Sequence, residues 1–418
     1  MLYARRIWPA VILVGLLCSA AQSQDHARLG DSAFEKGDFQ EAAKNYTEAL
    51  AAKPSFPLYV NLGHCYTRLE RWKEAAKAYQ AAVRLDKGAV TLEIWRFLAQ
   101  ALYNDNQYRQ AIEALGQAAS LEPGDKYDIL IARCMIGLEQ WVQAQSVLSG
   151  RLKHAPDNVE TLELLAYVVG QLGDWPGVID MYRQLLIAKP DHTEYRISLA
   201  NALAADGRNK QAIDTLEFAW RVDRGLSENT NRLLADLYLT EKMPREAAAC
   251  YARIIVASEN PTAEDFYRLG IAYFQTSELT SARDAFAGMQ KATPADARAD
   301  LYLGYIAAQR GDFDRAMVFY NAAEQKSPTL IDAIVATADL QMKKARYNDA
   351  AASFAKAIEL GDNRPLIHYN HTLALMRHGD TGQAQAALKK ALAEHPSDSN
   401  LIGLLDQCIE EDACSESP

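Results

Sequence analysis

A small residue recurs along this chain at a nearly constant interval, and no other feature constrains the fold as strongly. The steps between its successive positions are 33, 36, 33, 34, 34, 35, 35, 34, 34 and 34 residues. The positions are Ala42, Ala75, Ala111, Ala144, Val178, Ala212, Ala247, Ala282, Ala316, Ala350 and Ala384. A period of this length indicates a repeat protein, whose units stack only on their neighbours, so 418 residues need not divide into separate globular domains.

A second row of small residues accompanies the first at a fixed distance. Each member lies twelve residues before its partner: Gly30, Gly63, Ala99, Ala132, Ala166, Ala200, Ala235, Gly270, Gly304, Ala338 and Thr372. Two helices of a hairpin approach closely where both carry small side chains, and larger residues then fill the grooves beside the contact. Aromatic residues four positions after the first row supply that filling: Tyr46, Tyr79, Tyr182, Tyr251, Phe286, Tyr320 and Phe354. The pattern therefore predicts one helical hairpin per repeat.

The segments between the helices carry the signals of helix ends. Glycines stand at the turn of five hairpins, where we expect a left-handed backbone: Gly37, Gly173, Gly207, Gly311 and Gly379. Prolines follow the second helix of most repeats, at Pro54, Pro123, Pro156, Pro190, Pro294, Pro328 and Pro396. No segment alternates apolar and polar residues as a half-buried strand does. The chain is therefore expected to be all-α.

The repeats resemble those of the tetratricopeptide repeat family. One copy reads Phe266-x2-Leu269-Gly270-x2-Tyr273, then Ala282-x3-Phe286, then Pro294. A second reads Leu62-Gly63-x2-Tyr66, then Ala75-x3-Tyr79. Both match the family signature position by position, and the resemblance covers nearly the whole chain. It implies a right-handed superhelical solenoid of about eleven helical hairpins, of the generic exported bacterial type.

A leader is predicted at residues 1–23. Two arginines precede an apolar run over residues 7–18, and small residues follow it. This order is that of a secretory signal peptide, with cleavage after either Ala21 or Ser23. The run is shorter than the roughly 20 apolar residues of a membrane span. We therefore expect an exported chain, periplasmic or secreted; the alternatives are an uncleaved leader that anchors the chain and a lipid on Cys18.

The repeat array is expected to fill residues 24–396, and a different segment follows it. Residues 397–411 begin with Ser and Asp and then carry an apolar stripe at helical spacing, formed by Leu401, Leu404, Leu405 and Ile409. We expect a helix that covers the exposed core face of the last repeat. Residues 412–418 form an acidic tail that is expected to be disordered.

The cysteines do not have the spacing of a disulfide framework. Cys65 and Cys134 occupy equivalent positions two repeats apart, too distant for a bridge between helices packed about 8–10 Å apart. They are expected to be buried and to behave as small apolar residues. Whether Cys408 and Cys414 form a disulfide stays open.

The charge balance argues against two classes of partner. The chain has 44 Lys and Arg against 54 Asp and Glu, a formal net charge of -10. Removal of the leader also removes two arginines, which gives -10 - 2 = -12. An acidic chain lacks the broad positive field that nonspecific nucleic-acid binding needs, and anionic lipid headgroups repel it. We expect no nucleic acid and no membrane span in the mature chain.

The residues that carry chemistry are sparse. The sequence has no Gly-rich phosphate loop, no paired-histidine zinc helix and no serine elbow, so we expect no enzyme activity, no cofactor and no metal. His368 and His371 lie three residues apart on one predicted helix. Because no Cys or carboxylate stands at ligand spacing, core packing is favoured over metal binding.

The resemblance implies where partners bind. In this family the first helix of each hairpin lines a concave groove, which takes extended peptides or helices. Carried over by register, the groove receives Arg96, Gln100 and Tyr103 in the third repeat and Tyr267, Phe274 and Tyr305 in the eighth and ninth. Aromatic residues on such a face are typical anchors for partner side chains. Packing of Tyr267, Phe274 and Tyr305 on neighbouring repeats is an equally weighted alternative.

These features favour a non-catalytic scaffold for protein–protein interaction in the cell envelope. An alternative is a dedicated structural subunit of an envelope assembly, such as secretion, pilus, cell-wall or energy-transduction machinery. A regulator of a cell-wall enzyme or a glycan binder ranks last, because the tryptophans lie mostly at hairpin or core positions. The partner, the organism and the oligomeric state are not encoded in a recognisable motif.

Overall fold

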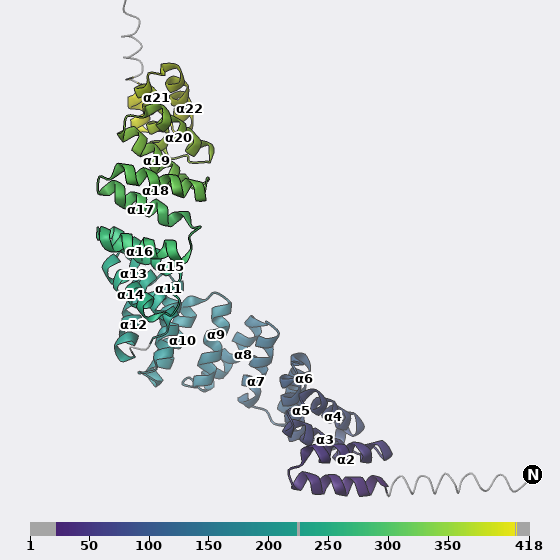
Figure 1. The fold of residues 1–418 in the computed structure, drawn as a ribbon. Helices are drawn as coiled ribbons and strands as arrows, with labels where there is room; N and C mark the ends of the chain where they lie inside the picture. Colours follow the sequence, from purple (N-terminus) through teal and green to yellow (C-terminus); the bar gives the residue numbers. More distant parts are fainter. Residues whose placement is uncertain (1–21, 224–225, 406, 408–418) are drawn as a thin grey trace, which may run out of the picture. The chain divides into compact units, whose positions relative to one another are not determined.

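The computed structural model describes residues 22–223, 226–405 and 407, and in this part of the chain the ordered elements are all helices (Figure 1). The all-α prediction is therefore confirmed. The chain divides into two compact units, Met1–Gly207 and Arg208–Pro418, which are taken separately below.

The first unit is a series of helical hairpins. Neighbouring helices pack antiparallel in pairs, and each pair packs on the next. A helix over residues 22–35 begins the series. It is followed by α2 (Phe39–Ala52), α3 (Phe56–Arg68), α4 (Trp72–Leu85), α5 (Leu92–Asn104), α6 (Tyr108–Leu121), α7 (Asp128–Gly137), α8 (Trp141–His154), α9 (Val159–Gln171), α10 (Trp175–Ala188) and α11 (Thr193–Ala205). Short 3-10 turns at Lys87–Ala89 and Asp125–Tyr127 precede α5 and α7.

The second unit repeats the same plan. After α12 (Asn209–Val222), five hairpins follow in order along the chain, coloured from teal to yellow in Figure 1. Their helices are α13 (Glu228–Thr240), α14 (Pro244–Ala257), α15 (Ala263–Gln275), α16 (Leu279–Ala292), α17 (Ala297–Gln309), α18 (Phe313–Lys326), α19 (Ile331–Lys343), α20 (Tyr347–Glu359), α21 (Pro365–His378) and α22 (Thr381–Glu394).

Both rows of small residues lie inside the hairpins, as the sequence predicts. Every member of both rows is buried, including the departures Val178 and Thr372. The aromatic residues of the second helices fill the space beside them: Tyr46, Tyr79, Tyr251, Phe286, Tyr320 and Phe354 are almost fully buried. Tyr182 is half-buried. The repeat period in the sequence is therefore a packing period.

Every hairpin turn has a left-handed residue seven positions after the small residue of its first helix. The five predicted glycines all have positive φ, between 75° and 89°. The other six turns place an ordinary residue there, with φ between 54° and 63°: Glu70, Asn106, Glu139, Lys242, Ser277 and Ala345. The turn geometry is thus common to all repeats, whereas the glycine is not.

A further helix follows the last hairpin. It is described over residues 399–405 and at residue 407, and the carboxylate of Asp398 accepts hydrogen bonds of 3.0 Å from the backbone N–H groups of Asn400 and Leu401. Leu401 and Leu404 are buried against Leu388 and Ala391 of α22, and Leu405 is exposed. The start of the predicted leader (residues 1–21), Ile409, Cys408 and Cys414, and the acidic tail lie outside the described residues.

Cys65 and Cys134 are fully buried, as expected, and burial raises the pKa of each thiol to about 12. Both are therefore uncharged apolar side chains at neutral pH. Among the described residues, no helix combines the length and apolarity required to cross a membrane.

Candidate protein-interaction surfaces

One exposed aromatic residue stands out on the first unit. Phe97 in α5 is 40% exposed. Its ring meets the edge of His64 with ring centroids 4.8 Å apart, and it stacks on Tyr79 at 6.1 Å with an interplanar angle of 14°. Because Tyr79 is fully buried, it supports the Phe97 ring from below. Phe97 is thus held in place and still open to solvent.

Phe97 lies in the wall of a hollow of about 390 Å³ between α5 and α7. The lining residues are Glu93, Arg96, Phe97, Gln100, Leu115, Lys126, Tyr127 and Leu130. The hollow has an apolar floor and a charged rim, the arrangement of a pocket for one side chain of a protein partner. Arg96 and Gln100, both predicted groove residues, belong to it.

Tyr103, the third predicted residue of this repeat, does not line the hollow. It is half-buried, and its ring lies 5.8 Å from that of Tyr108 at the start of α6. Tyr103 was predicted as a partner-binding residue, whereas Phe97 was not. The signal that identifies Phe97 is its register: it lies two residues before the small residue of the helix, as Leu130 does in the next repeat.

In the second unit, the predicted aromatic residues gather around Tyr302 of α17. The Tyr302 ring has its centroid 5.7 Å from that of Tyr267, 5.9 Å from Phe274 and 5.6 Å from Tyr305, each in an edge-on contact. It also stacks on the buried ring of Phe286 at 4.8 Å. Tyr302 was not predicted from the sequence. Like Phe97, it lies two residues before the small residue of its helix.

Tyr267, Phe274 and Tyr305 are therefore brought together, but each is half-buried by packing on its neighbours. Their contacts agree better with packing on neighbouring repeats than with freely exposed anchor residues. Burial, reinforced by the carboxylates of Asp332 and Asp339, raises the pKa of Tyr305 to about 12. These aromatic residues pack neighbouring repeats together, and only part of their surface is exposed.

Charged residues link successive first helices across the same face. Asp236 pairs with Arg268 at 3.3 Å, Glu264 with Arg298 at 3.2 Å and Asp332 with Arg364 at 3.7 Å. The Arg298 guanidinium also lies 4.4 Å above the centre of the Tyr267 ring. Because these pairs are partly exposed, each contributes little to stability. They give the face alternating positive and negative groups.

Tyrosines of the second helices reach through to this face with their hydroxyls. Tyr46 donates to Asp31 at 2.7 Å and Tyr251 donates to Asp236 at 2.5 Å. Tyr79 shares a hydrogen bond of 2.9 Å with Nδ1 of His64. In each pair the residue on the first helix directly follows the small residue. The side chains of Asp31, His64 and Asp236 on the first helices are therefore oriented by hydrogen bonds from the second helix of the same hairpin.

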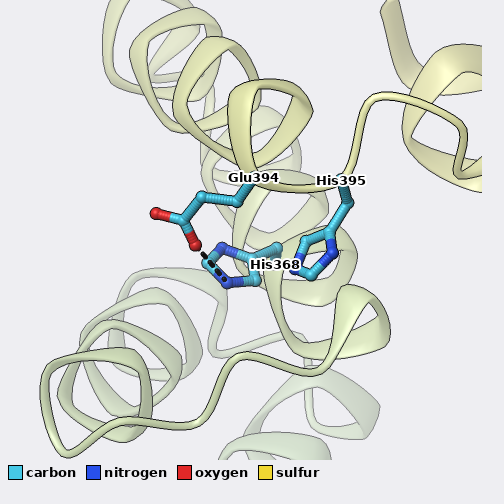
Figure 2. Close-up of side chains that lie close together, drawn as sticks. All are labelled: His368, Glu394 and His395. Atoms are coloured by element: carbon cyan, nitrogen blue, oxygen red, sulfur yellow. Dashed lines mark ion pairs between the residues drawn. The ribbon is translucent and has the colours of Figure 1, made fainter.

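The histidines near the C-terminal end have different neighbours from those that sequence spacing indicates. His371 is half-buried on the same helix as His368, and burial is the main cause that lowers its pKa. His368 is 4% exposed. It lies beside Glu394 and His395, which stand at the end of α22 (Figure 2). The prediction that no carboxylate stands at ligand spacing is wrong for His368, because packing of the end of α22 brings Glu394 beside it.

The two units define a class of protein: stacked helical hairpins, each closed by contacts at small residues, that offer side chains on their first helices. Family comparisons give the family. Residues 12–232 match the family model of the cilia and flagella-associated protein 70 C-terminal domain, and residues 232–297, 267–331 and 335–399 match that of the tetratricopeptide repeat. The chain belongs to the tetratricopeptide repeat family, with its first half in the branch that the former model describes. This is a fold of protein–protein interaction scaffolds.

Similar proteins share only part of the chain. A stretch of 94 residues, 22% of this chain and 10% of the relative, is 32% identical to sperm-associated antigen 1 of Mus musculus. A stretch of 214 residues is 22% identical to DnaJ homolog subfamily C member 7 of Homo sapiens and covers 48% of this chain and 41% of that protein. The chain thus spans less than half the length of these relatives.

Solved structures align with the chain at TM-scores below 0.5. Yeast Tom70 covers 95% of this chain and 97% of its own, at 12% identity and a TM-score of 0.40. The pilF protein of Pseudomonas aeruginosa covers 51% and 97%, at 16% identity and a TM-score of 0.42. YrrB, described as a TPR protein with an unusual peptide-binding site, covers 47% and 97%, at 19% identity and a TM-score of 0.38.

Proposed function

We propose that this chain is a non-catalytic scaffold of the cell envelope that binds another protein at the hollow between α5 and α7. The observation that carries the proposal is Phe97, which is 40% exposed although a buried tyrosine and a histidine hold its ring in place. A fixed and exposed aromatic ring loses little conformational entropy when a partner covers it, which is the property of an interface anchor.

The hollow favours a partner segment with one apolar side chain between polar or charged neighbours. Phe97, Tyr127 and Leu130 present apolar surface, while Arg96 and Glu93 carry opposite charges and Lys126 pairs with Glu122. Charges of both signs favour polar or charged residues beside the apolar one in the partner. A hollow of about 390 Å³ takes a single large side chain, so an extended peptide or one face of a helix fits.

The cell-envelope part of the proposal depends on the predicted leader at residues 1–23. Ser23 lies in the helix that is described over residues 22–35, and its hydroxyl donates a hydrogen bond of 2.9 Å to the backbone oxygen of Ala49. Cleavage after Ala21 keeps this bond, whereas cleavage after Ser23 removes it. We therefore propose the former site. The mass of the N-terminal peptide of protein recovered from the envelope tests it, and recovery from the cytosol alone contradicts export.

The binding surface is tested by site-specific photocrosslinking in the cell envelope. A photoreactive residue replaces Gln100, which lines the hollow, and in a second variant it replaces Ile187, which is 81% exposed on α10. We expect defined crosslinked products with the probe at position 100. The probe at position 187 should give none of these products. Phe97→Ala, combined with the probe at position 100, is expected to remove these products.

The outcome also separates the two forms of the proposal. One partner captured at a fixed ratio indicates a dedicated subunit of an envelope assembly, while several partners that share a sequence feature indicate a general adaptor. The same products at positions 100 and 187, or products that Phe97→Ala leaves unchanged, contradict a binding site at the hollow.

A further inference from the structure

Three separate segments meet at the C-terminal end of the second unit. Asn363 belongs to the loop between α20 and α21, His368 to the first turn of α21, and Glu394 and His395 to the end of α22 (Figure 2). One ligand atom from each of His368, Glu394 and His395 lies within 4.8 Å of the other two. Figure 2 shows the His368 ring between the Glu394 carboxylate and the His395 ring.

The ligand atoms of these residues lie near one another. Nε2 of His368 and Nε2 of His395 each lie 3.1 Å from Oδ1 of Asn363. Oε2 of Glu394 lies 3.7 Å from Nε2 of His368. Two ligands of a tetrahedral zinc ion, each about 2.0–2.1 Å from the metal, are about 3.3 Å apart. The separation between Glu394 and His368 is longer than that value, and all three ligand atoms lie within 4.8 Å of one another, so the side chains move closer together when they bind an ion.

Two imidazole nitrogens face the same amide oxygen, whose two lone pairs can accept one hydrogen bond from each ring. As hydrogen bonds, both contacts require that the proton of each ring is on Nε2. When a cation binds, the proton of each neutral ring moves to Nδ1, so that each Nε2 offers its lone pair to the ion. His368 is 4% exposed, while 37% of the Glu394 side chain is open to solvent. The pocket therefore has a buried wall and an open side by which an ion enters.

We propose that His368, His395 and Glu394 form a binding site for zinc or a similar late first-row divalent ion, with Asn363 at its border. Imidazole nitrogen together with one carboxylate is a ligand set of Zn²⁺, whereas Mg²⁺ and Ca²⁺ require oxygen ligands throughout. Three protein ligands leave a fourth position, which the Asn363 amide oxygen or water fills. The ion joins the α20–α21 loop, α21 and the end of α22, and so stabilises the last repeat.

The proposal is tested by titration of the full, untagged chain with ZnCl₂ in a calorimeter, with MgCl₂ and CaCl₂ as parallel probes. We expect one Zn²⁺ per chain and no comparable binding of the other two. His395→Ala and Glu394→Gln change partly exposed residues and leave the buried packing intact. Because loss of even an outer-shell partner weakens a metal site by roughly 10–100-fold, each variant is expected to weaken zinc binding at least that much.

The matched control is His378→Ala, which removes an exposed histidine from the other end of α21. Zinc affinity is expected to stay within a factor of about two in this variant, because His378 is outside the cluster. Circular dichroism confirms that each variant is folded. Failure of the wild-type chain to bind Zn²⁺ overturns the site. Equal zinc affinity in the His395→Ala and His378→Ala variants overturns it too, since binding then comes from scattered surface histidines.

Discussion

A β carbon on Gly63 would lie 2.5 Å from Cε1 of Tyr79, so the two helices of this hairpin can pack only around a missing side chain. The Tyr79 ring cannot move aside to make room. It is fully buried, it shares a hydrogen bond with His64, and it stacks on Phe97. The same relationship recurs between Gly30 and Tyr46 and between Gly270 and Phe286, where the separation would be 2.6 Å.

The first prediction is that Gly63→Ala destabilises the first unit. The added methyl group overpacks the hairpin, which costs about 1–3 kcal/mol. The control is Gly116→Ala in α6, where a β carbon meets nothing within 4 Å. That change is expected to stabilise the unit by about 0.5–1 kcal/mol, because alanine is the better helix former. Urea unfolding followed by circular dichroism measures both, and a stabilising Gly63→Ala contradicts the packing account.

The second prediction exploits the left-handed turn residue that every hairpin has. Gly311 and Ala345 occupy equivalent turns of adjacent repeats, with φ of 80° and 54°. An L-residue in this conformation costs about 1–2 kcal/mol, and the greater entropy of glycine offsets part of that cost. We therefore expect Ala345→Gly to stabilise the second unit by about 0.5–1 kcal/mol and Gly311→Ala to destabilise it by a similar amount. Thermal unfolding of the two variants should shift in opposite directions.

The third prediction concerns a buried ion pair between α13 and α15. Asp265 is 2% exposed and accepts hydrogen bonds of 2.7 and 2.8 Å from the Arg232 guanidinium. It also completes a capping box with Thr262 at the start of α15. Burial alone would raise the pKa of Asp265, but the hydrogen bonds from Arg232 and Thr262 outweigh it and lower the pKa. Asp265 therefore stays charged in the folded chain.

The sign of the pH effect follows from this lowered pKa. An unfolded chain has an aspartate pKa of about 3.9, so the pair contributes its full stability above that pH. The contribution is lost as the pH falls through the lower pKa of the folded state. Asp265→Asn is expected to cost about 2–3 kcal/mol at pH 7, less than a fully buried pair, because Arg232 is partly exposed.

The measurement is the free energy of unfolding of both proteins between about pH 7 and pH 3. The stability of the wild-type chain should fall more steeply with acid than that of Asp265→Asn, so the difference between the two narrows. Asp284→Asn serves as control, because Asp284 is 65% exposed. It should change stability by under about 0.5 kcal/mol. A difference between Asp265→Asn and the wild type that stays constant with pH contradicts the role given to the ion pair.

The fold could be predicted from the sequence because its determinants are local and repeated. The small residues at Gly63 and Ala75 constrain one helix contact, and the same contact returns in every hairpin. The turns were predicted only where glycine occupies them. Glu70 and Ala345 take the same left-handed backbone without any sequence signal, because the surrounding helices impose the turn on whatever residue is there.

The candidate surfaces could be predicted less completely. Arg96 and Gln100 were predicted from the family register, but Phe97 and Tyr302 were not. Tyr302 lies three residues before Tyr305, and residues three apart on a helix share a face. The grouping of His368 with His395 has no local signal. Only the packing of α21 against the end of α22 brings the two side chains together.

The fourth prediction separates binding residues from packing residues. Tyr305 contacts both Tyr302 and Tyr320, so Tyr305→Ala leaves a cavity between repeats. Since full burial of such a ring is worth about 3–5 kcal/mol, removal of this half-buried one should cost about 2–3 kcal/mol. Phe97→Ala should cost less than about 1.5 kcal/mol, because much of the ring is already in water. In the photocrosslinking experiment the order reverses: Phe97→Ala should abolish partner capture at the hollow, and Tyr305→Ala, in the other unit, should leave it intact while the chain is folded. Equal loss of stability in the two variants would contradict the distinction between Phe97 as a binding residue and Tyr305 as a residue that packs the repeats together.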